Sequence, residues 1–388
     1  MDRPIIYLDN NATTPIDPRV LEAMMPYLTD EYANASSTHI FGVKANEAVK
    51  KARKQVADLI GAQPHEIVFT SGATEAINLA IKGVCENNKI VGKHIITVST
   101  EHSAVLDTCR YLETQGFEVT YLPVKNDGLI ELEDLKKALR DDTILVSIMM
   151  ANNETGVIQP IKEISKIIHQ TKALIFSDTT QAVGKITVDV NDLDVDIICM
   201  SGHKMYAPKG IGALYIRQNK GRIKLTPLLH GGGHERGLRS GTLNVPGIVA
   251  LGVASDLLRK ETPSRANKIK ELRDYLEQEL MKIEGSFING NLENRLPNTL
   301  NICFPGVDSD ALILSLSQPD DDRPIIAISN GSACTAASIE PSHVLLNMGL
   351  NQELARHSSR FSLGRKNAKS EIEQVILFIK NTIIALKF

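Results

Sequence analysis

The sequence predicts an α/β fold, in which helices flank a mostly parallel β-sheet and a smaller α+β domain is attached. Short apolar segments alternate with helical segments over about the first 250 residues, and strands that alternate with helices form parallel βαβ units. The apolar segments lack the period-two alternation of half-exposed strands, which indicates strands covered on both faces. Beyond that point a long polar helical stretch appears and strand candidates become sparse.

The expected elements follow in chain order. In the large domain we expect strands at 67–70, 94–99, 118–122, 144–149, 173–177, 195–200 and 213–216. Helices are expected at 74–86, from Ala104 onward, and at 132–139 and 161–168. In the small domain we expect a helix at 264–283, strands at 299–304, 325–329 and 361–363, and a final amphipathic helix at 371–386.

Length and composition exclude several classes of protein. A chain of 388 residues with 43% apolar and 23% charged residues can bury a core without disulfides and is not mainly disordered. A formal charge of −3 argues against a general nucleic-acid-binding or membrane-binding surface. No apolar run approaches the ~18 residues of a membrane span, and no signal peptide is recognisable. The five cysteines form no C-x-x-C pair, so we expect a reducing, cytoplasmic location.

One motif is suited to holding a phosphate. Ser71-Gly72-Ala73-Thr74-Glu75 lies between a predicted strand and a predicted helix, where open α/β sheets bind ligands. The free N–H groups at a helix N-terminus attract anions, and Thr74 adds a hydroxyl. The alternative is an ordinary helix cap with a glutamate in the first turn.

Two further motifs end predicted strands and carry an acid and a lysine. Asp178 follows the strand at 173–177, and Ser201-Gly202-His203-Lys204 follows the strand at 195–200. An acid at a strand end can pair with a cationic ring nitrogen. A lysine near an apolar strand end can be desolvated, which makes its amine nucleophilic. The alternatives are a capping aspartate and a surface lysine.

His102 and Cys334 complete the set of candidate groups. His102 follows the strand at 94–99 and could stack on a cofactor ring or transfer protons, or be a structural histidine. Cys334 lies in a loop of small residues, where exposure favours the reactive thiolate; the alternative is a buried apolar thiol. A metal at His230 and His234 is disfavoured because glycines separate them and no third ligand is evident. Together, a phosphate cradle, a ring-stacking group, an acid and a lysine predict a site for pyridoxal 5'-phosphate.

The chain resembles the NifS/IscS-type cysteine desulfurases, which belong to the class-V aminotransferase group of the fold-type I pyridoxal-phosphate enzymes. The resemblance runs nearly end to end. It is carried by these segments: Leu8-Asp9-Asn10-Asn11-Ala12-Thr13-Thr14-Pro15, Asn34-Ala35-Ser36-Ser37-Thr38-His39, Thr70-Ser71-Gly72-Ala73-Thr74-Glu75, Asn152-Asn153-Glu154-Thr155-Gly156, Ser201-Gly202-His203-Lys204, Arg239-Ser240-Gly241-Thr242-Leu243-Asn244-Val245-Pro246, Gly331-Ser332-Ala333-Cys334-Thr335 and Arg360-Phe361-Ser362-Leu363-Gly364-Arg365.

The resemblance implies how the cofactor is held. Lys204 would carry it covalently and later move the Cα proton. Asp178 would pair with the pyridine nitrogen, His102 would stack on the ring and assist proton transfer, and Gln181 would contact the ring hydroxyl. Further cofactor contacts would come from Ala73, Thr74, Asn153, Ser201 and His203, joined by Thr242 from a neighbouring subunit.

The resemblance also implies a substrate and partners. Asn153 and Arg360 would bind the carboxylate of L-cysteine, and Cys334 would take its sulfur as a persulfide. We expect a homodimer, with residues 15–255 forming the large cofactor domain and residues 1–14 and 256–388 forming the small domain that carries the Cys334 loop. The sulfur would pass to an acceptor protein for iron–sulfur cluster assembly or for thio-modification of nucleic acid, without membrane or direct nucleic-acid binding.

Three features depart from the family pattern. The segment 316–323 is longer and more acidic than is usual, Asn330 stands where serine is common, and Ser359 replaces an apolar residue. With Asn330, this motif resembles that of the desulfurases that serve DNA phosphorothioation, which adds that pathway to the alternatives. Two other activities stay open from the sequence: another class-V enzyme, such as a selenocysteine lyase or an aminotransferase, and a non-catalytic phosphate-binding module.

Overall fold

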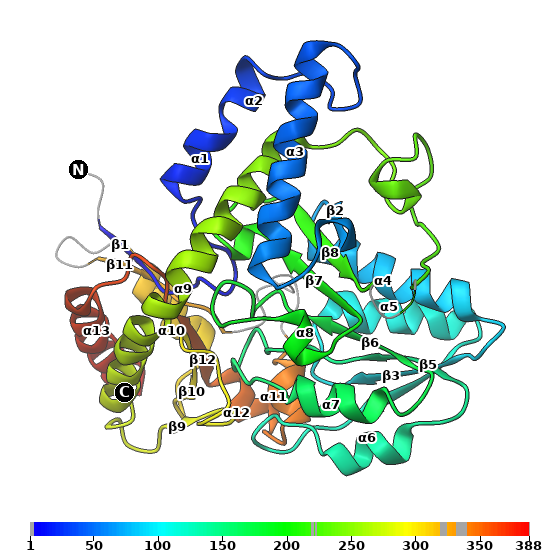
Figure 1. Cartoon of the computed structure of the whole chain (residues 1–388). Coiled ribbons are helices and arrows are strands. Elements are labelled where there is room, and N and C mark those ends of the chain that lie inside the picture. Colours follow the sequence, from blue (N-terminus) through cyan, green and yellow to red (C-terminus); the bar gives the residue numbers. More distant parts are fainter. Residues whose placement is uncertain (1–3, 219–220, 222, 319–323, 331–339, 388) are drawn as a thin grey trace.

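A seven-stranded sheet forms the centre of the molecule (Figure 1). The structure, a computed structural model, describes all residues except 1–3, 219–220, 222, 319–323, 331–339 and 388. β8 is antiparallel to both of its neighbours, and the remaining strands run parallel to one another. The strand order is β2 (Ile67–Thr70), β8 (Gly212–Ile216), β7 (Ile197–Ser201), β6 (Leu174–Asp178), β5 (Thr143–Ser147), β3 (His94–Val98) and β4 (Glu118–Leu122).

Helices cover both faces of this sheet, as the continuous apolar strands predict. α4 (Ala73–Asn88) and α5 (Ser103–Thr114) pack on one face against strand residues such as Leu145 and Phe176. α3 (Ile40–Leu59), α7 (Ile161–Ile168) and α9 (Val245–Leu280) pack on the other face. The predicted α/β class with a mostly parallel sheet is confirmed, and the carboxyl ends of all strands except β8 lie at one edge.

The C-terminal part forms a separate core that also includes the N-terminal strand. β10 (Thr299–Cys303) pairs antiparallel with β9 (Phe287–Ile288) and β12 (Ser358–Ser362). β1 (Ile5–Tyr7) pairs parallel with β11 (Ile325–Ala327). α10 (Ser309–Ser317) and α13 (Lys369–Lys387) pack on these strands. Chain segments from both termini therefore meet beside the central sheet (Figure 1).

The structure adds elements that the sequence pattern does not reveal. α3 buries small residues, Ala45, Val49, Ala52 and Val56, whose modest hydrophobicity gives little signal. α9 is one helix of 36 residues that contains Pro263, and it continues through residue 255, where we placed a domain boundary. Proline normally ends or kinks a helix, so local propensity does not indicate a helix that continues through Pro263.

The remaining helices are short. They are α1 (Pro18–Met24), α2 (Pro26–Thr29), α6 (Leu132–Ala138), α8 (Val190–Leu193), α11 (His343–Asn347), α12 (Gln352–Arg356) and the 3₁₀ turns η1 (Pro64–Glu66), η2 (Gly202–Lys204) and η3 (Glu235–Gly237). Within the described ranges, no helix combines the length and the apolar character needed to cross a membrane.

Candidate active site

A cavity of about 470 Å³ opens at the carboxyl edge of the central sheet. Its lining includes every predicted site residue except Thr242 and Cys334: Ala73, Thr74, His102, Asn153, Asp178, Gln181, Ser201, His203, Lys204 and Arg360. Thr242 is exposed and lies outside the lining. Cys334 falls outside the described residues. The fold thus brings together groups that are up to 287 positions apart in the chain (Ala73 to Arg360).

One end of the cavity is built to hold an anion. α4 begins at Ala73, and no side chain caps its free N–H groups, so they are available to a negative ligand. Thr74, Ser201 and His203 line the same cavity. Desolvation, and then the charges of Lys204 and Lys209, lower the pKa of His203 to about 4. Its imidazole is therefore neutral at physiological pH and binds as a dipole.

A carboxylate stands at the middle of the cavity. Asp178 ends β6, and its Oδ1 accepts hydrogen bonds from the backbone N–H of Thr180 (2.9 Å) and from the thiol of Cys199 (3.2 Å). Burial and the charge of Asp178 raise the pKa of Cys199 well above its ordinary value, so this thiol stays protonated and donates. Among the described residues no group donates to Oδ2 of Asp178, which leaves that oxygen for a cationic ligand atom.

Lys204 lies at the end of η2, directly after β7. Its Nζ atom donates to the backbone carbonyls of Asn11 and of Ala12 (2.6 Å to the latter). A Cβ on Gly202 would come within 2.8 Å of the Ile211 side chain and 3.0 Å of the Pro208 carbonyl. Only glycine therefore allows the tight turn that places Lys204 over the cavity.

His102 caps α5 and its ring faces the cavity. Its Nδ1 accepts a hydrogen bond from the backbone N–H of Ala104 (3.1 Å), so the neutral ring carries its proton on Nε2. The adjacent Glu101 is fully buried, and its Oε1 accepts from the Met149 N–H (2.5 Å). Desolvation raises the pKa of Glu101 well above its ordinary value, which indicates that the acid next to His102 in the chain is neutral.

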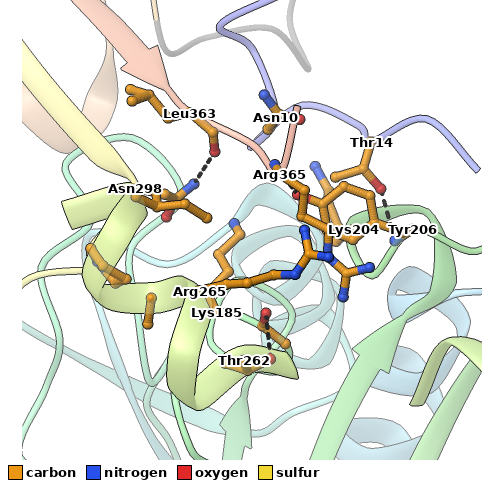
Figure 2. A pocket seen from close by; sticks show the side chains of 14 residues that line it. Asn10, Thr14, Lys185, Lys204, Tyr206, Thr262, Arg265, Asn298, Leu363 and Arg365 are labelled. Atoms are coloured by element: carbon orange, nitrogen blue, oxygen red, sulfur yellow. Dashed lines mark hydrogen bonds between the residues drawn. The ribbon is translucent and has the colours of Figure 1, made fainter. Parts of the chain in front are cut away.

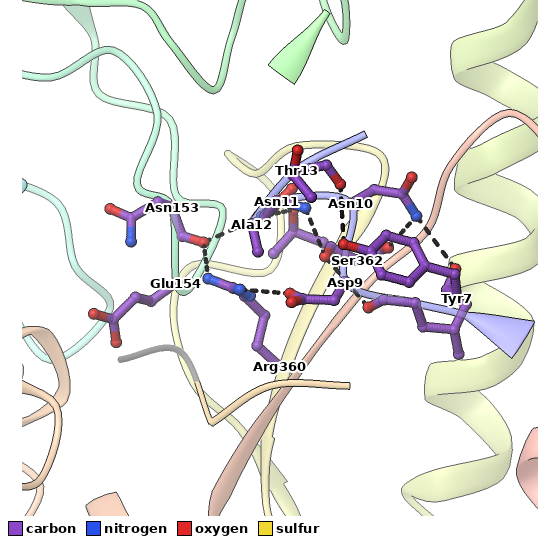
Figure 3. A network of polar contacts seen from close by, with 12 residues as sticks. Tyr7, Asp9, Asn10, Asn11, Ala12, Thr13, Asn153, Glu154, Arg360 and Ser362 are labelled. Carbon is purple, nitrogen blue, oxygen red and sulfur yellow. Dashed lines mark hydrogen bonds and ion pairs between the residues drawn. The ribbon is translucent and has the colours of Figure 1, made fainter. Parts of the chain in front are cut away.

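Arg360 reaches the cavity from β12 in the C-terminal part (Figure 3). It is 2% exposed and pairs through Nη2 with Asp9 Oδ1 (2.6 Å). Its Nη1 donates to the Asn153 carbonyl (3.0 Å), while its buried Nε has no partner among the described residues. A positive group is thereby held in a fixed orientation, with one donor left unsatisfied.

Sequence reasoning missed several groups around the cavity. Asn11 is fully buried and links the N-terminal segment to the loop after β5 and to β10: its side chain donates to the Asn153 carbonyl (3.1 Å) and to Thr299 Oγ1 (3.0 Å). Its motif is one of the segments that carry the resemblance, yet nothing local to it indicates contact with Lys204. Lys209 and Lys185, which have no distinguishing motif, were also missed.

Comparisons with known proteins identify the family to which this chain is similar. The profile of the family described as aminotransferase class-V matches residues 6–375. A relative named cysteine desulfurase IscS, from Pasteurella multocida, is 53% identical over 385 residues, which cover 98% of this chain and 93% of the relative. A solved structure described as a NifS-like protein has a TM-score of 0.90 and 40% identity, with all of both chains covered. Another, described as SspA in complex with cysteine, has a TM-score of 0.81 and 41% identity, covering 92% of this chain and 98% of that one.

Proposed function

Because this chain belongs to the class-V aminotransferase family and matches cysteine desulfurases along almost its whole length, we propose that it is a pyridoxal-phosphate-dependent cysteine desulfurase. It converts L-cysteine to L-alanine and holds the sulfur as a persulfide on Cys334. The main support for this proposal is that Lys204, Asp178, His102 and Arg360 line one and the same cavity. A selenocysteine lyase or an aminotransferase is the less favoured activity.

The cavity fits the phosphate and the ring nitrogen of the cofactor. The uncapped N-terminus of α4, with Thr74, Ser201 and His203, suits the phosphate, and the available Oδ2 of Asp178 suits a protonated ring nitrogen. When bound, pyridoxal phosphate supplies an electron sink that stabilises negative charge at the Cα of an amino acid.

The protein's own residues position the substrate and move its proton. Arg360 binds the carboxylate of L-cysteine, and Asn153 lies beside it. Lys204 accepts the proton from Cα, since its amine lies over the cavity. The Cys334 thiolate forms an S–S bond with the substrate sulfur while the Cβ–S bond breaks. The electron pair of that bond stays on the carbon skeleton, which takes up a proton and leaves as alanine.

The proposal includes a homodimer, in which a second copy of the chain contributes to the site. Several large apolar side chains on α1, α2 and the start of α3 are exposed in the single chain, among them Leu21, Leu28 and Phe41. Thr242 is exposed and outside the cavity of its own chain, which is consistent with a role in a partner's site. The homodimer is tested by size-exclusion chromatography with light scattering, in which Leu28→Glu should shift the mass toward that of one chain.

The sulfur acceptor is a protein of iron–sulfur cluster assembly or of nucleic-acid thio-modification, including DNA phosphorothioation. We place the reaction in the cytoplasm, and we divide the chain into a large domain of residues 15–255 and a small domain of residues 1–14 and 256–388. The separate apolar core formed by residues 6–8 and 276–383 supports that division. Capture of proteins by the Cys334 persulfide distinguishes the acceptor classes.

The direct test compares Cys334→Ala with Cys85→Ala. Cys85 is a buried thiol in α4, away from the cavity lining, so its removal controls for the loss of a thiol. Given L-cysteine, the natural chain and Cys85→Ala should form alanine and a persulfide, whereas Cys334→Ala should keep the cofactor's visible absorbance and form neither product. An oxo-acid in place of alanine would identify an aminotransferase instead.

A further inference from the structure

A second lysine lies beside the cofactor cavity without a carboxylate partner. Lys185 follows β6 by seven residues, is partly buried, and donates from Nζ to Asn11 Oδ1 (2.8 Å) and to Gln181 Oε1. Within the described part of the chain it forms no ion pair. Both of its acceptors belong to residues that line the cofactor cavity.

Lys185 determines the orientation of the side-chain amide of Gln181. Because the amide oxygen accepts from Lys185, the amide nitrogen points the other way, where Nε2 donates to the Asn11 carbonyl (2.9 Å). That nitrogen carries a second hydrogen, which remains for a ligand in the cavity. Gln181 consequently presents a donor, and not an acceptor, to any oxygen of the cofactor ring.

Asn11 joins Lys185 to Lys204. Its side-chain oxygen accepts from Lys185, and its backbone oxygen accepts from Lys204. Both lysines also line a small cavity of about 30 Å³ behind the cofactor site, together with Arg265 and Arg365 (Figure 2). The amines of Lys185 and Lys204 thus lie close together, and both donate to uncharged oxygens of Asn11.

The charges that face Lys185 are positive. Desolvation and the charges of Lys204 and Arg360 lower its pKa well below the ordinary value. In the cavity behind the site, Arg365 pairs with Asp17 (3.1 Å) and approaches Glu261 (3.6 Å), and Arg265 pairs with Glu261 (3.1 Å). On the cofactor side, Asp9 pairs with Arg360.

The carboxylates of Asp9, Asp17 and Glu261 are therefore committed to arginines. The lowered pKa favours the neutral amine of Lys185, which still has hydrogens to donate to Asn11 and to Gln181.

We propose that Lys185 is a positioning residue of the desulfurase: it orients the Gln181 amide so that a hydrogen-bond donor faces the cofactor. This inference rests on the proposed function, because it concerns the same cavity. Lys185 touches neither substrate nor cofactor and acts through Gln181.

The test is a pH titration of the cofactor's visible absorbance in the purified holoprotein. In Lys185→Met, the absorbance should titrate at a higher pH than in the natural chain, by up to about one pH unit, because a ring oxygen of the cofactor loses a well-oriented donor that stabilises its negative charge. Cofactor binding should weaken by about tenfold, the usual effect of losing one well-oriented hydrogen bond. Lys172→Met makes the same change at an exposed lysine and should leave both values unaltered.

Two further variants test the orienting role directly. Lys185→Gln keeps a hydrogen-bond donor, so its titration and its cofactor affinity should both stay nearer the natural values than those of Lys185→Met. Combining Lys185→Met with Gln181→Met should weaken cofactor binding by less than the product of the single effects, because one acts through the other.

The outcomes distinguish the inference from the proposed function. If the natural chain takes up no cofactor, the proposed function fails. If it takes up cofactor and Lys185→Met titrates at the same pH and binds the cofactor with the same affinity as Lys172→Met, the role assigned to Lys185 is overturned while the proposed function stands. Unchanged circular dichroism of each variant guards against a loss of fold.

Discussion

Replacing Arg360 tests how the site recognises its substrate. Arg360 is buried, and its guanidinium is held by Asp9 Oδ1 (2.6 Å) and the Asn153 carbonyl (3.0 Å). Arg360→Met removes the charge and both hydrogen bonds. If Arg360 binds the cysteine carboxylate, losing a hydrogen bond between charged groups costs about 1.5–3 kcal/mol, which corresponds to roughly a 10- to 150-fold fall in kcat/KM.

The same substitution also affects folding, and the structure allows the two effects to be separated. The side chain of Asp9 is 18% exposed, so leaving it unpaired should cost less than the ~3–5 kcal/mol of a fully buried pair, about 2 kcal/mol. Asp9→Asn breaks the same ion pair but keeps the guanidinium. It should lose a comparable amount of stability while retaining the KM for L-cysteine.

The assay is alanine release as a function of L-cysteine concentration, with urea unfolding measured in parallel. Arg360→Lys keeps the charge but not the planar fork, and its KM should lie between those of the natural chain and Arg360→Met. A KM for Arg360→Met within twofold of the natural value would refute the role of Arg360 in binding the carboxylate.

Two other substitutions give independent checks. Asp178→Asn should keep the cofactor but lower kcat by about 10²-fold or more, since a charge that stabilises the reacting group is lost; a kcat within threefold of the natural value would contradict its pairing with the ring. Glu101 has a pKa well above its ordinary value because it is buried, so the folded chain holds a proton that the unfolded chain releases. Stability should therefore fall as the pH rises above about 4.5, at up to ~1.4 kcal/mol per pH unit, until the pKa of the folded state is reached. Urea unfolding of Glu101→Gln between pH 5 and 8 should show a flatter profile, and equal slopes for both proteins would disprove the buried neutral acid.

The sequence is most informative where the chemistry is local. Thr74, Asp178, Ser201 and Lys204 each stand at or just after the end of a strand whose apolar run is visible in the sequence. Because the carboxyl ends of parallel strands share one edge, the convergence of these residues follows from the strand pattern alone.

The remaining site residues depend on long-range packing. Arg360 lies in β12 of the C-terminal part, and its partner Asp9 is 351 positions away. Only the resemblance to a family predicts its role. Lys185 and Asn11 are 174 positions apart, and no spacing or motif indicates that they meet. Cys334 is predicted from its loop and the family pattern, and it lies outside the described residues.

The most direct test of the central claim is to locate the cofactor on the chain. Among the residues that the structure describes, three lysines lie near the cavity: Lys204, Lys185 and Lys209. Borohydride reduction of the holoprotein, followed by peptide mass mapping, should find the phosphopyridoxyl group on Lys204 alone. A label on Lys185 or Lys209, or a protein that retains no label, would contradict the account.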